Sequence, residues 1–194
     1  LALGMSIATL LFTFVHSYAA QPPLAVALED DLVRIRGSYD AGGEGRWRRT
    51  FPEEELLEYR KLAGTFRAVA GWTFSMVALD AGGDAARRGL DAKATFVTEN
   101  YFSVLGVRPV LGPGLPAVEP DDPAAAAVAV IGHTAWDQLF GRSPDVIGST
   151  VAVNGVPVTV VGVAPERFIG MEAPIPFQLW MPLSARRLVM PEPV

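Results

Sequence analysis

The 194-residue chain contains no cysteine and only two histidines, His16 and His133. The absence of cysteine excludes disulfides, thiolate metal sites and cysteine nucleophiles, although it leaves the cellular compartment open. Two histidines are too few for a histidine-rich metal centre. We therefore expect no metal ligands and no cofactor in this chain.

Positive charge is also scarce, because 16 Lys and Arg stand against 21 Asp and Glu, which gives a formal net charge of −5. Only Lys61 and Lys93 are lysines, so nearly all of the cations are arginines. A protein that binds nucleic acid usually carries a large basic patch for the phosphates, and none is evident here. Nucleic acid is therefore not an expected partner.

Familiar catalytic motifs are missing as well. The chain has neither a G-x-S-x-G nucleophile elbow nor a G-x-x-x-x-G-K-[ST] phosphate loop. The glycines within 42–45 lack the G-x-G-x-x-G spacing, and the acidic runs 53–55 and 121–122 are typical of a solvated helix end and an exposed loop. His133 has no serine or cysteine nucleophile in a recognisable frame, so we expect it to cap or pack. The chain is therefore expected to have no catalytic residues and not to be an enzyme.

Residues 1–20 form a single run without any charged side chain. A helix of twenty residues rises about 30 Å, the thickness of a bilayer hydrocarbon core, and Pro22 and Pro23 would end it. The alternatives are a cleaved signal peptide, with the small-x-small pattern of 17–19 as its cleavage site, and a buried core helix. We expect a transmembrane helix over residues 1–21, truncated at its start, so that the charges that would set its orientation are not visible.

The remaining residues alternate short strands, short helices and turns rich in Gly and Pro. Apolar alternation or continuous apolar runs predict strands at 32–36, 69–80, 88–97, 124–131, 150–153, 156–163 and 177–183. Helical spacing and capping residues predict helices from the Thr50 cap to Phe66, at 99–105 after a Thr98 cap, and at 135–140. The glycine-rich stretch 37–49 is predicted to be a loop or a hairpin tip.

Two details of these elements can be checked directly in a structure. Trp72, Phe74 and Met76 recur at period two, which favours packing into the core, with a ligand-binding shelf as the alternative. Asn154-Gly155 lies between two alternating strands and is a strong signal for a tight hairpin, since both residues tolerate positive φ. The whole pattern predicts an α+β fold with mixed and antiparallel sheets and short helices.

Several strings along the chain resemble one known family, in matching order and spacing. They are VTENYFSVLGVRP at 97–109, VAVIGHTAW at 128–136, FG at 140–141, VIG at 146–148, VNG at 153–155, TVVGVAP at 159–165 and LWMPL at 179–183. They resemble the periplasmic core domain of MacB/FtsX-type ABC transporter permeases, and more narrowly the duplicated orphan permeases of acidobacterial type. The chain departs from the family pattern at Leu115, where an aromatic residue is common, and at the acidic stretch 28–31, where basic residues are common.

The resemblance implies a division of the chain and a mechanical role. Residues 1–21 would be the first membrane span, residues 24–184 a MacB-like extracytoplasmic domain, and residues 185–194 an exit linker toward later spans. Such a domain couples the motion driven by a cytoplasmic ABC ATPase to substrate export or handling on the outer side of the bacterial inner (plasma) membrane. The implied partners are membrane lipid, that ATPase, and a second copy of the chain or a duplicated permease half.

Two other functions remain open from the residues alone. One is a membrane-anchored extracytoplasmic binding or adhesion module without a transport role. The other is a secreted enzyme that uses carboxylates whose pairing cannot be read from the sequence; a pocket holding close carboxylates with shifted pKa values would favour it.

Overall fold

The computed structural model describes residues 32–40, 46–49, 51–61, 64–82, 90–116, 127–171 and 178–190. The transmembrane helix predicted over residues 1–21 lies outside these ranges. Within them, no helix has both the length and the apolar character that a membrane crossing requires.

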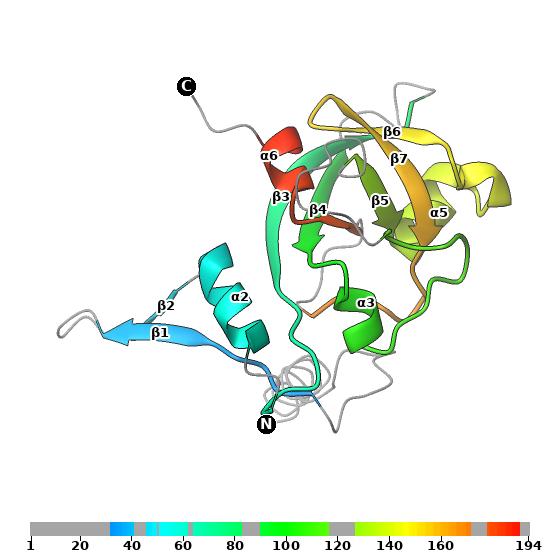
Figure 1. Ribbon diagram of the computed structural model, residues 1–194. Coiled ribbons are helices and arrows are strands. Elements are labelled where there is room, and N and C mark those ends of the chain that lie inside the picture. Colours follow the sequence, from blue (N-terminus) through cyan, green and yellow to red (C-terminus); the bar gives the residue numbers. More distant parts are fainter. Residues whose placement is uncertain are drawn as a thin grey trace, which may run out of the picture.

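Six strands close into a barrel in the order β3-β4-β8-β5-β7-β6 (Figure 1). The strands are β3 Trp72–Asp80, β4 Leu90–Val97, β5 Val128–Ile131, β6 Thr150–Val153, β7 Val156–Val163 and β8 Gln178–Pro182. β4 runs parallel to β8, and β5 runs parallel to β7, whereas the other neighbouring strands are antiparallel. This mixed sheet with short helices agrees with the predicted α+β class.

The barrel interior is filled by every second residue of its strands, because successive side chains of a strand point to opposite faces. The largest of these buried residues are Leu79, Phe96, Ile131, Leu179 and Met181. A second buried cluster lies outside the barrel wall, where short segments cover β4, β5 and β8. Its buried members are Val97, Tyr101, Phe102, Leu105, Val107, Val130, Ala164, Phe168 and Trp180.

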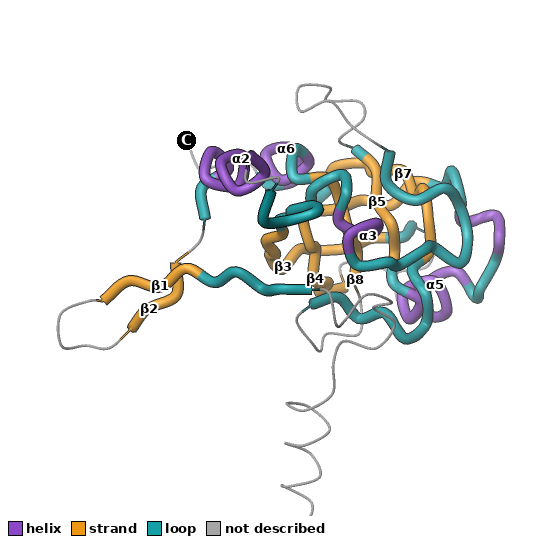
Figure 2. Tube along the Cα trace, turned by 60° about the horizontal axis from the view of Figure 1, so that its bottom comes forward, coloured by secondary structure: helices purple, strands orange, loops and turns teal. Residues whose placement is uncertain are grey.

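Short helices lie around this barrel (Figure 2). They are α2 Glu53–Lys61, α3 Tyr101–Val104, α5 His133–Phe140, the 3-10 turn η3 Pro144–Val146, and α6 Ala185–Val189. Two further strands, β1 Gly37–Asp40 and β2 Arg46–Arg49, pair with each other in a separate two-stranded sheet. The hairpin that they form extends away from the barrel, on the side opposite to α5 (Figures 1 and 2).

The first predicted strand is wrong in its position. Residues 32–36 have no regular secondary structure, and β1 begins only at Gly37, inside the stretch predicted to be a loop or a hairpin tip. The alternation of apolar and basic residues there does not reflect a buried strand face, because Val33 keeps 76% of its surface exposed.

The predicted core face of β3 is also wrong. Phe74 and Met76 are each 47% exposed, whereas Val77 and Leu79 of the opposite face are buried in the barrel. The reason is the alternation of the strand, since Val77 and Leu79 point into the barrel core. Phe74 and Met76 occupy the alternate positions and therefore lie on the outer face of the barrel.

The C-terminal boundary of the domain lies further along the chain than predicted. The predicted exit linker starts at residue 185, but Ala185 and Val189 of α6 are buried in the barrel cluster. Residues 185–190 therefore belong to the packed domain, and residues 191–194 lie outside the described ranges.

Candidate coupling site between helix α2 and the barrel

Among the residues weighed as catalytic or metal-binding candidates, His133 lies in the described part of the chain. His133 opens α5 and packs edge-on against the Trp136 ring, with 5.4 Å between the ring centroids. The expected packing role is therefore confirmed, whereas the N-cap position belongs to Gly132. Over the described ranges, no three His, Asp or Glu side chains gather in a way that could hold a metal ion. The acidic pair 121–122 lies outside those ranges.

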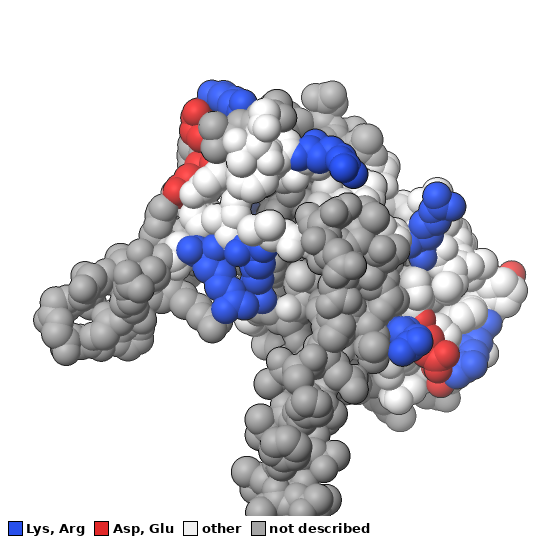
Figure 3. All heavy atoms as spheres, turned by 90° about the horizontal axis from the view of Figure 1, so that it is seen from below, with Lys and Arg blue, Asp and Glu red and all other residues white. Residues whose placement is uncertain are grey.

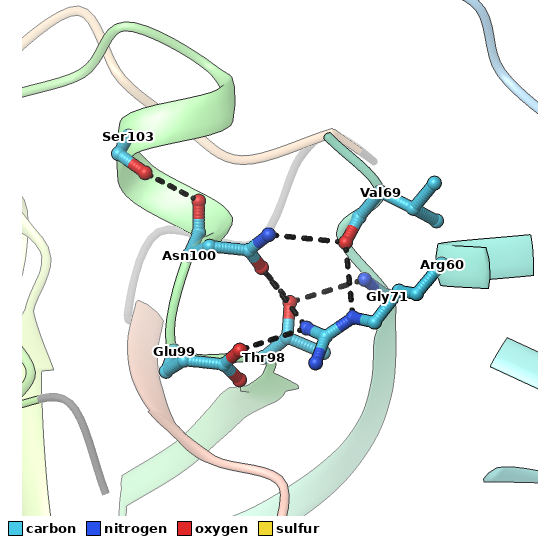
Figure 4. Close-up of polar contacts among 7 residues, drawn as sticks. All are labelled: Arg60, Val69, Gly71, Thr98, Glu99, Asn100 and Ser103. Atoms are coloured by element: carbon cyan, nitrogen blue, oxygen red, sulfur yellow. Dashed lines mark hydrogen bonds and ion pairs between the residues drawn. The ribbon is translucent and has the colours of Figure 1, made fainter. Parts of the chain in front are cut away.

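A polar network joins α2 to the turn that follows β4 (Figure 4). The local sequence explains why α2 forms. Pro52 precedes its first residue, the run 53–55 places acidic residues at the positive end of the helix dipole, and Arg60 and Lys61 occupy the last turn. The helix therefore carries a cation at the end that faces the turn.

Arg60 connects three separate segments of the chain. Its Nε donates to the carbonyl oxygen of Val69 at 3.3 Å, and its Nη2 donates to Oδ1 of Asn100 at 3.3 Å. The same Nη2 lies 3.0 Å from Oε1 of Glu99. A guanidinium group suits this position because its planar fork presents several donors in fixed directions.

Thr98 and Asn100 form the opposite side of the network. The Thr98 hydroxyl accepts from the N–H of Gly71 at 3.2 Å and donates to Oδ1 of Asn100 at 2.8 Å. The Asn100 amide nitrogen donates to the carbonyl oxygen of Val69 at 3.1 Å. Thr98 is buried, so its hydroxyl would be costly to bury without these partners.

An apolar contact reinforces the same junction. A Cβ atom built on Gly71 would lie only 3.0 Å from Cδ2 of Leu56, so the helix packs directly against the backbone of the segment that enters β3. Together with Arg60, this contact fixes both the middle and the end of α2 against the start of the barrel.

The junction continues into the barrel through aromatic rings. Phe102 of α3 lies 5.6 Å from Tyr101 and 5.9 Å from Trp180 of β8, both in edge-on arrangements, measured between ring centroids. Phe168 contacts Trp180 as well, with 5.0 Å between centroids. α3 is therefore fixed to the barrel wall, and the polar network at its start is held on a rigid support.

The sequence signals found only part of this site. Thr98 was predicted to cap the following helix, and this prediction is wrong, because the N-cap residue is Asn100 and it makes no side-chain capping bond. The hydroxyl of Thr98 is used by the junction instead. Arg60 carries no distinguishing local pattern, since its partner Asn100 is 40 positions away.

A family model described as MacB-like periplasmic core domain matches residues 1–193. The chain belongs to the MacB-like periplasmic core domain family. The resemblance noted in the short strings above is thus confirmed over almost the entire sequence.

Curated relatives support the same placement. A probable export ATP-binding/permease protein of Pseudomonas fluorescens (strain Pf0-1) is 33% identical over 93 residues, which is 48% of this chain and 14% of that protein. The macrolide export ATP-binding/permease protein MacB of Salmonella paratyphi A is 34% identical over 91 residues, 47% of this chain and 14% of that protein. The chain spans only a small part of the length of these relatives.

A solved structure supports the fold. The extracellular domain of the noncanonic ABC-type transporter YknZ from Gram-positive bacteria superposes with a TM-score of 0.56 and 18% sequence identity. The match covers 71% of this chain and 65% of that domain. The MacB-like architecture is therefore seen in both sequence and structure.

Proposed function

We propose that this chain is the extracytoplasmic domain of an ABC transporter permease subunit, which couples ATPase-driven motion across the membrane to substrate export or handling on the outer side. The observation that carries this proposal is the family match over residues 1–193. The names of the relatives, export ATP-binding/permease proteins, agree with it.

The α2 junction supports a mechanical role for the domain. α2 lies between residues 32–49 and the barrel in the chain, so it offers one route by which a displacement from the N-terminal side reaches the barrel, beside the direct contact of Arg34 with Trp72 of β3. Packed side chains and hydrogen-bond networks carry coupling between distant parts of a protein. Arg60, with acceptors at Val69 and at the turn of Glu99 and Asn100, supplies such a link at the point where α2 meets the barrel.

The proposal includes a location and a set of partners. The first span, residues 1–21, would hold the chain in the bacterial inner (plasma) membrane, with the barrel on the periplasmic or extracytoplasmic side. A cytoplasmic ABC ATPase would supply the energy, and a second copy of the chain or a duplicated permease half would complete the transporter. The domain itself would perform no chemical reaction.

An experiment on the full-length permease in lipid nanodiscs with its ABC ATPase tests this role. Other cysteines are replaced, Gln138 of α5 is changed to cysteine and labelled with a fluorophore, and energy transfer to a dye on the lipid headgroups reports the position of the barrel. We expect ATP to shift this signal. Arg60→Ala should keep ATP hydrolysis while reducing the shift, because the junction is weakened.

Arg142→Gln is the matched control, since it removes an arginine that pairs with Asp137 at 2.7 Å far from α2. It should leave the shift unchanged. Three results would contradict the proposal. The chain could wash off membranes in carbonate, it could fail to associate with any ABC ATPase, or ATP could leave the energy-transfer signal of the unmodified protein unchanged.

A further inference from the structure

One edge of strand β3 is open over most of its length. β3 pairs with β4 from Trp72 to Leu79, whereas it meets β6 only at Leu79 and Asp80. In Figure 1, β3 runs along the left side of the barrel and comes close to β6 only at its upper end. The earlier part of this edge therefore has no neighbouring strand among those that the structure describes.

Two residues of the open edge direct their backbone groups outward. The N–H and C=O of Ala78 bond to Asn154, on the side away from β4. In an antiparallel pair, alternate residues turn their backbone groups to the same edge, so Phe74 and Met76 also direct theirs away from β4. Among the hydrogen bonds of the described residues, none reaches the backbone of Phe74 or Met76 from that side. Each of the two residues therefore offers one donor and one acceptor to an added strand.

The same residues present apolar side chains to the outside. Phe74 and Met76 are half-exposed, and Ala78 continues the apolar stripe on the outer face. The Lys93 ammonium lies 5.0 Å from the centroid of the Phe74 ring, which holds this ring on the outer face of β3 and β4. β3 contains no proline and no charge before Asp80, so it lacks the features with which proteins usually protect an open edge. An unprotected edge beside an apolar stripe is typical of a site where a peptide adds to a sheet.

A helix lies at each end of this edge. At its start, Leu56 of α2 packs against Gly71. At its end, Asn154 bonds to β3 and also donates to the carbonyl oxygen of Val189 in α6. Figures 1 and 2 show α2 and α6 on the same side of β3. The β3 open edge, residues 72–78, therefore accepts about six residues of an added strand, or roughly 20 Å, before it reaches a helix.

Positive charge lies at both ends of the β3 open edge. Arg186 and Arg187 of α6 are exposed, and neither has an ion pair or a side-chain hydrogen bond with any described residue. At the start of β3, the Arg34 guanidinium lies 5.0 Å from the centroid of the Trp72 ring, and the nearby Arg67 is exposed. Figure 3 shows that Lys and Arg predominate among the described charged side chains on the face at this end of the barrel. Acidic residues at both ends of an added segment would complement these cations.

We propose that the β3 open edge binds an extended segment of another protein, which adds to the barrel as a strand. The backbone groups of Phe74 and Met76 form the hydrogen bonds, and their side chains contact apolar residues at every second position of the segment. Acidic residues at the two ends of the segment lie near Arg34 and near Arg186. A second copy of β3 fits less well, because it would bring its own cations against these arginines. This inference goes beyond the proposed coupling role and requires neither the ATPase nor the membrane location.

The test uses the full chain in lipid nanodiscs and the synthetic peptide Glu-Glu-Val-Thr-Val-Thr-Val-Glu-Glu. Amide hydrogen exchange, followed by NMR, reports the contact. We expect the peptide to slow exchange at Phe74 and Met76, whose N–H groups point to the open edge. Exchange at Ser75 should not change, because its N–H points to Ala94 of β4. A peptide with Lys in place of every Glu should bind about tenfold more weakly or less, because it repels the arginines.

Two methylated peptides test the backbone bonds without any change in the protein. In an added antiparallel strand, the residues opposite Phe74 and Met76 exchange hydrogen bonds with them, and these are the Val residues of the peptide. Methylation of the Val amide nitrogens should therefore abolish the protection of Phe74 and Met76. Methylation of the Thr amide nitrogens, which point away from β3, should preserve it.

Variants of the chain test the same contact from the other side. Met76→Pro removes an outward N–H at an edge position that tolerates proline, and should weaken peptide binding about tenfold or more. The double change R186S/R187S should remove much of the preference for the glutamate peptide over the lysine peptide. Arg142→Gln, beside α5 across the barrel, should keep that preference. An unchanged melting curve shows that the barrel is intact in each variant.

Unchanged exchange at Phe74 and Met76 with about 1 mM glutamate peptide would overturn the proposal. Equal binding of the two methylated peptides would overturn it as well, because the contact would then not be a strand addition. Protection of these two amides that rises with chain concentration, without any peptide, would assign the edge to a second copy of the chain instead. The peptide measurements use no ATP and no ATPase, so a failure of the coupling role does not affect their outcome.

Discussion

The side-chain amide nitrogen of Asn154 donates a hydrogen bond to the carbonyl oxygen of Val189 at 3.0 Å, which ties the β6–β7 turn to α6. Oδ1 of the same side chain accepts from the N–H of Ala78 at 2.8 Å, and the Asn154 N–H donates to the Ala78 carbonyl at 2.8 Å. One turn residue therefore connects β3, the closing seam of the barrel and the last helix.

Replacing Asn154 by Gly should lower the free energy of unfolding by about 1–2 kcal/mol, because two side-chain hydrogen bonds are lost. Gly tolerates the positive φ of 51° at this position, so the turn itself should persist. Denaturant unfolding measures the change. Hydrogen exchange should show that the Met190 amide, which donates to Arg186 in α6, loses the most protection.

Asn154→Asp is the matched control for that prediction. The carboxylate keeps the acceptor for the Ala78 N–H and loses the donor to Val189, so α6 should loosen while the β3 contact is kept. Equal exchange rates of the Met190 amide in the unmodified protein and in both variants would show that Asn154 does not hold α6.

The Arg60 junction makes a second prediction. Arg60→Lys should release α2 almost as fully as Arg60→Ala, since a single ammonium group cannot reproduce the directed contacts of the guanidinium with Val69, Glu99 and Asn100. α2 has nine residues, which is too short to be stable alone, so its amides should exchange rapidly once it is undocked. Hydrogen exchange of Leu56 compared with that of Phe96 in the barrel measures this. If the Leu56 amide keeps its protection from exchange in Arg60→Lys, a single positive charge is enough to hold α2 and the planar guanidinium is not needed.

The ion pair within this junction should contribute little by itself. The side chains of Arg60 and Glu99 are 29% and 42% exposed, and partly exposed pairs are screened by water. A double-mutant cycle of Arg60→Ala with Glu99→Gln should give a coupling below about 1 kcal/mol. A larger coupling would mean that the charge pair, rather than the hydrogen bonds to Val69 and Asn100, dominates the junction.

Local patterns predicted the elements of this fold well. The Asn154-Gly155 turn between β6 and β7 is where the sequence indicates it, and both residues have positive φ. The strands around the 69–97 hairpin and the helix ending at Gly141 were also predicted from alternation, spacing and glycine. These features depend on residues that are close together in the chain, so they can be predicted from the sequence alone.

Long-range features could not be predicted in the same way. The barrel closes through Leu79 with Val153 and Asp80 with Ala152, and no periodicity encodes which strands meet. Val77 and Leu79 turn into the barrel and leave Phe74 on the outer face, so the apolar alternation of β3 suggested the wrong face. The α2 junction depends on residues about forty positions apart, and for this reason the sequence does not single out Arg60.

Trp180 leads to a prediction about the core. Its indole is fully buried, and no partner for its Nε1–H lies among the described residues. Trp180→Ala should cost about 3–5 kcal/mol through the cavity that it creates. Trp180→Phe should cost below about 1.5 kcal/mol, because it keeps most of the packing and removes an unsatisfied buried donor. Thermal and denaturant unfolding of the two variants measure the difference.

Trp136 is the comparison for Trp180, because its Nε1–H donates to the carbonyl oxygen of Ser143 at 2.8 Å. The ring is only half-buried, so Trp136→Ala should cost less than Trp180→Ala. Trp136→Phe removes a hydrogen bond, whereas Trp180→Phe removes none. Much of the loss in free energy of unfolding caused by Trp136→Ala should therefore also be seen in Trp136→Phe. A similar loss for Trp180→Phe and Trp180→Ala would show that the Trp180 indole nitrogen has a partner.

Asp137 leads to a prediction about acid. The Arg142 guanidinium donates to its Oδ1 at 2.7 Å and lowers the pKa of this carboxyl below its ordinary value. A carboxyl with a lowered pKa stabilises the folded state above its unfolded pKa, and this contribution is lost as pH falls through the folded pKa. An NMR titration of Asp137 should therefore show a low midpoint that rises in Arg142→Gln. The pair is exposed, so salt should weaken the effect of Arg142 on the pKa of Asp137. If neither salt nor Arg142→Gln moves the midpoint, another group lowers this pKa.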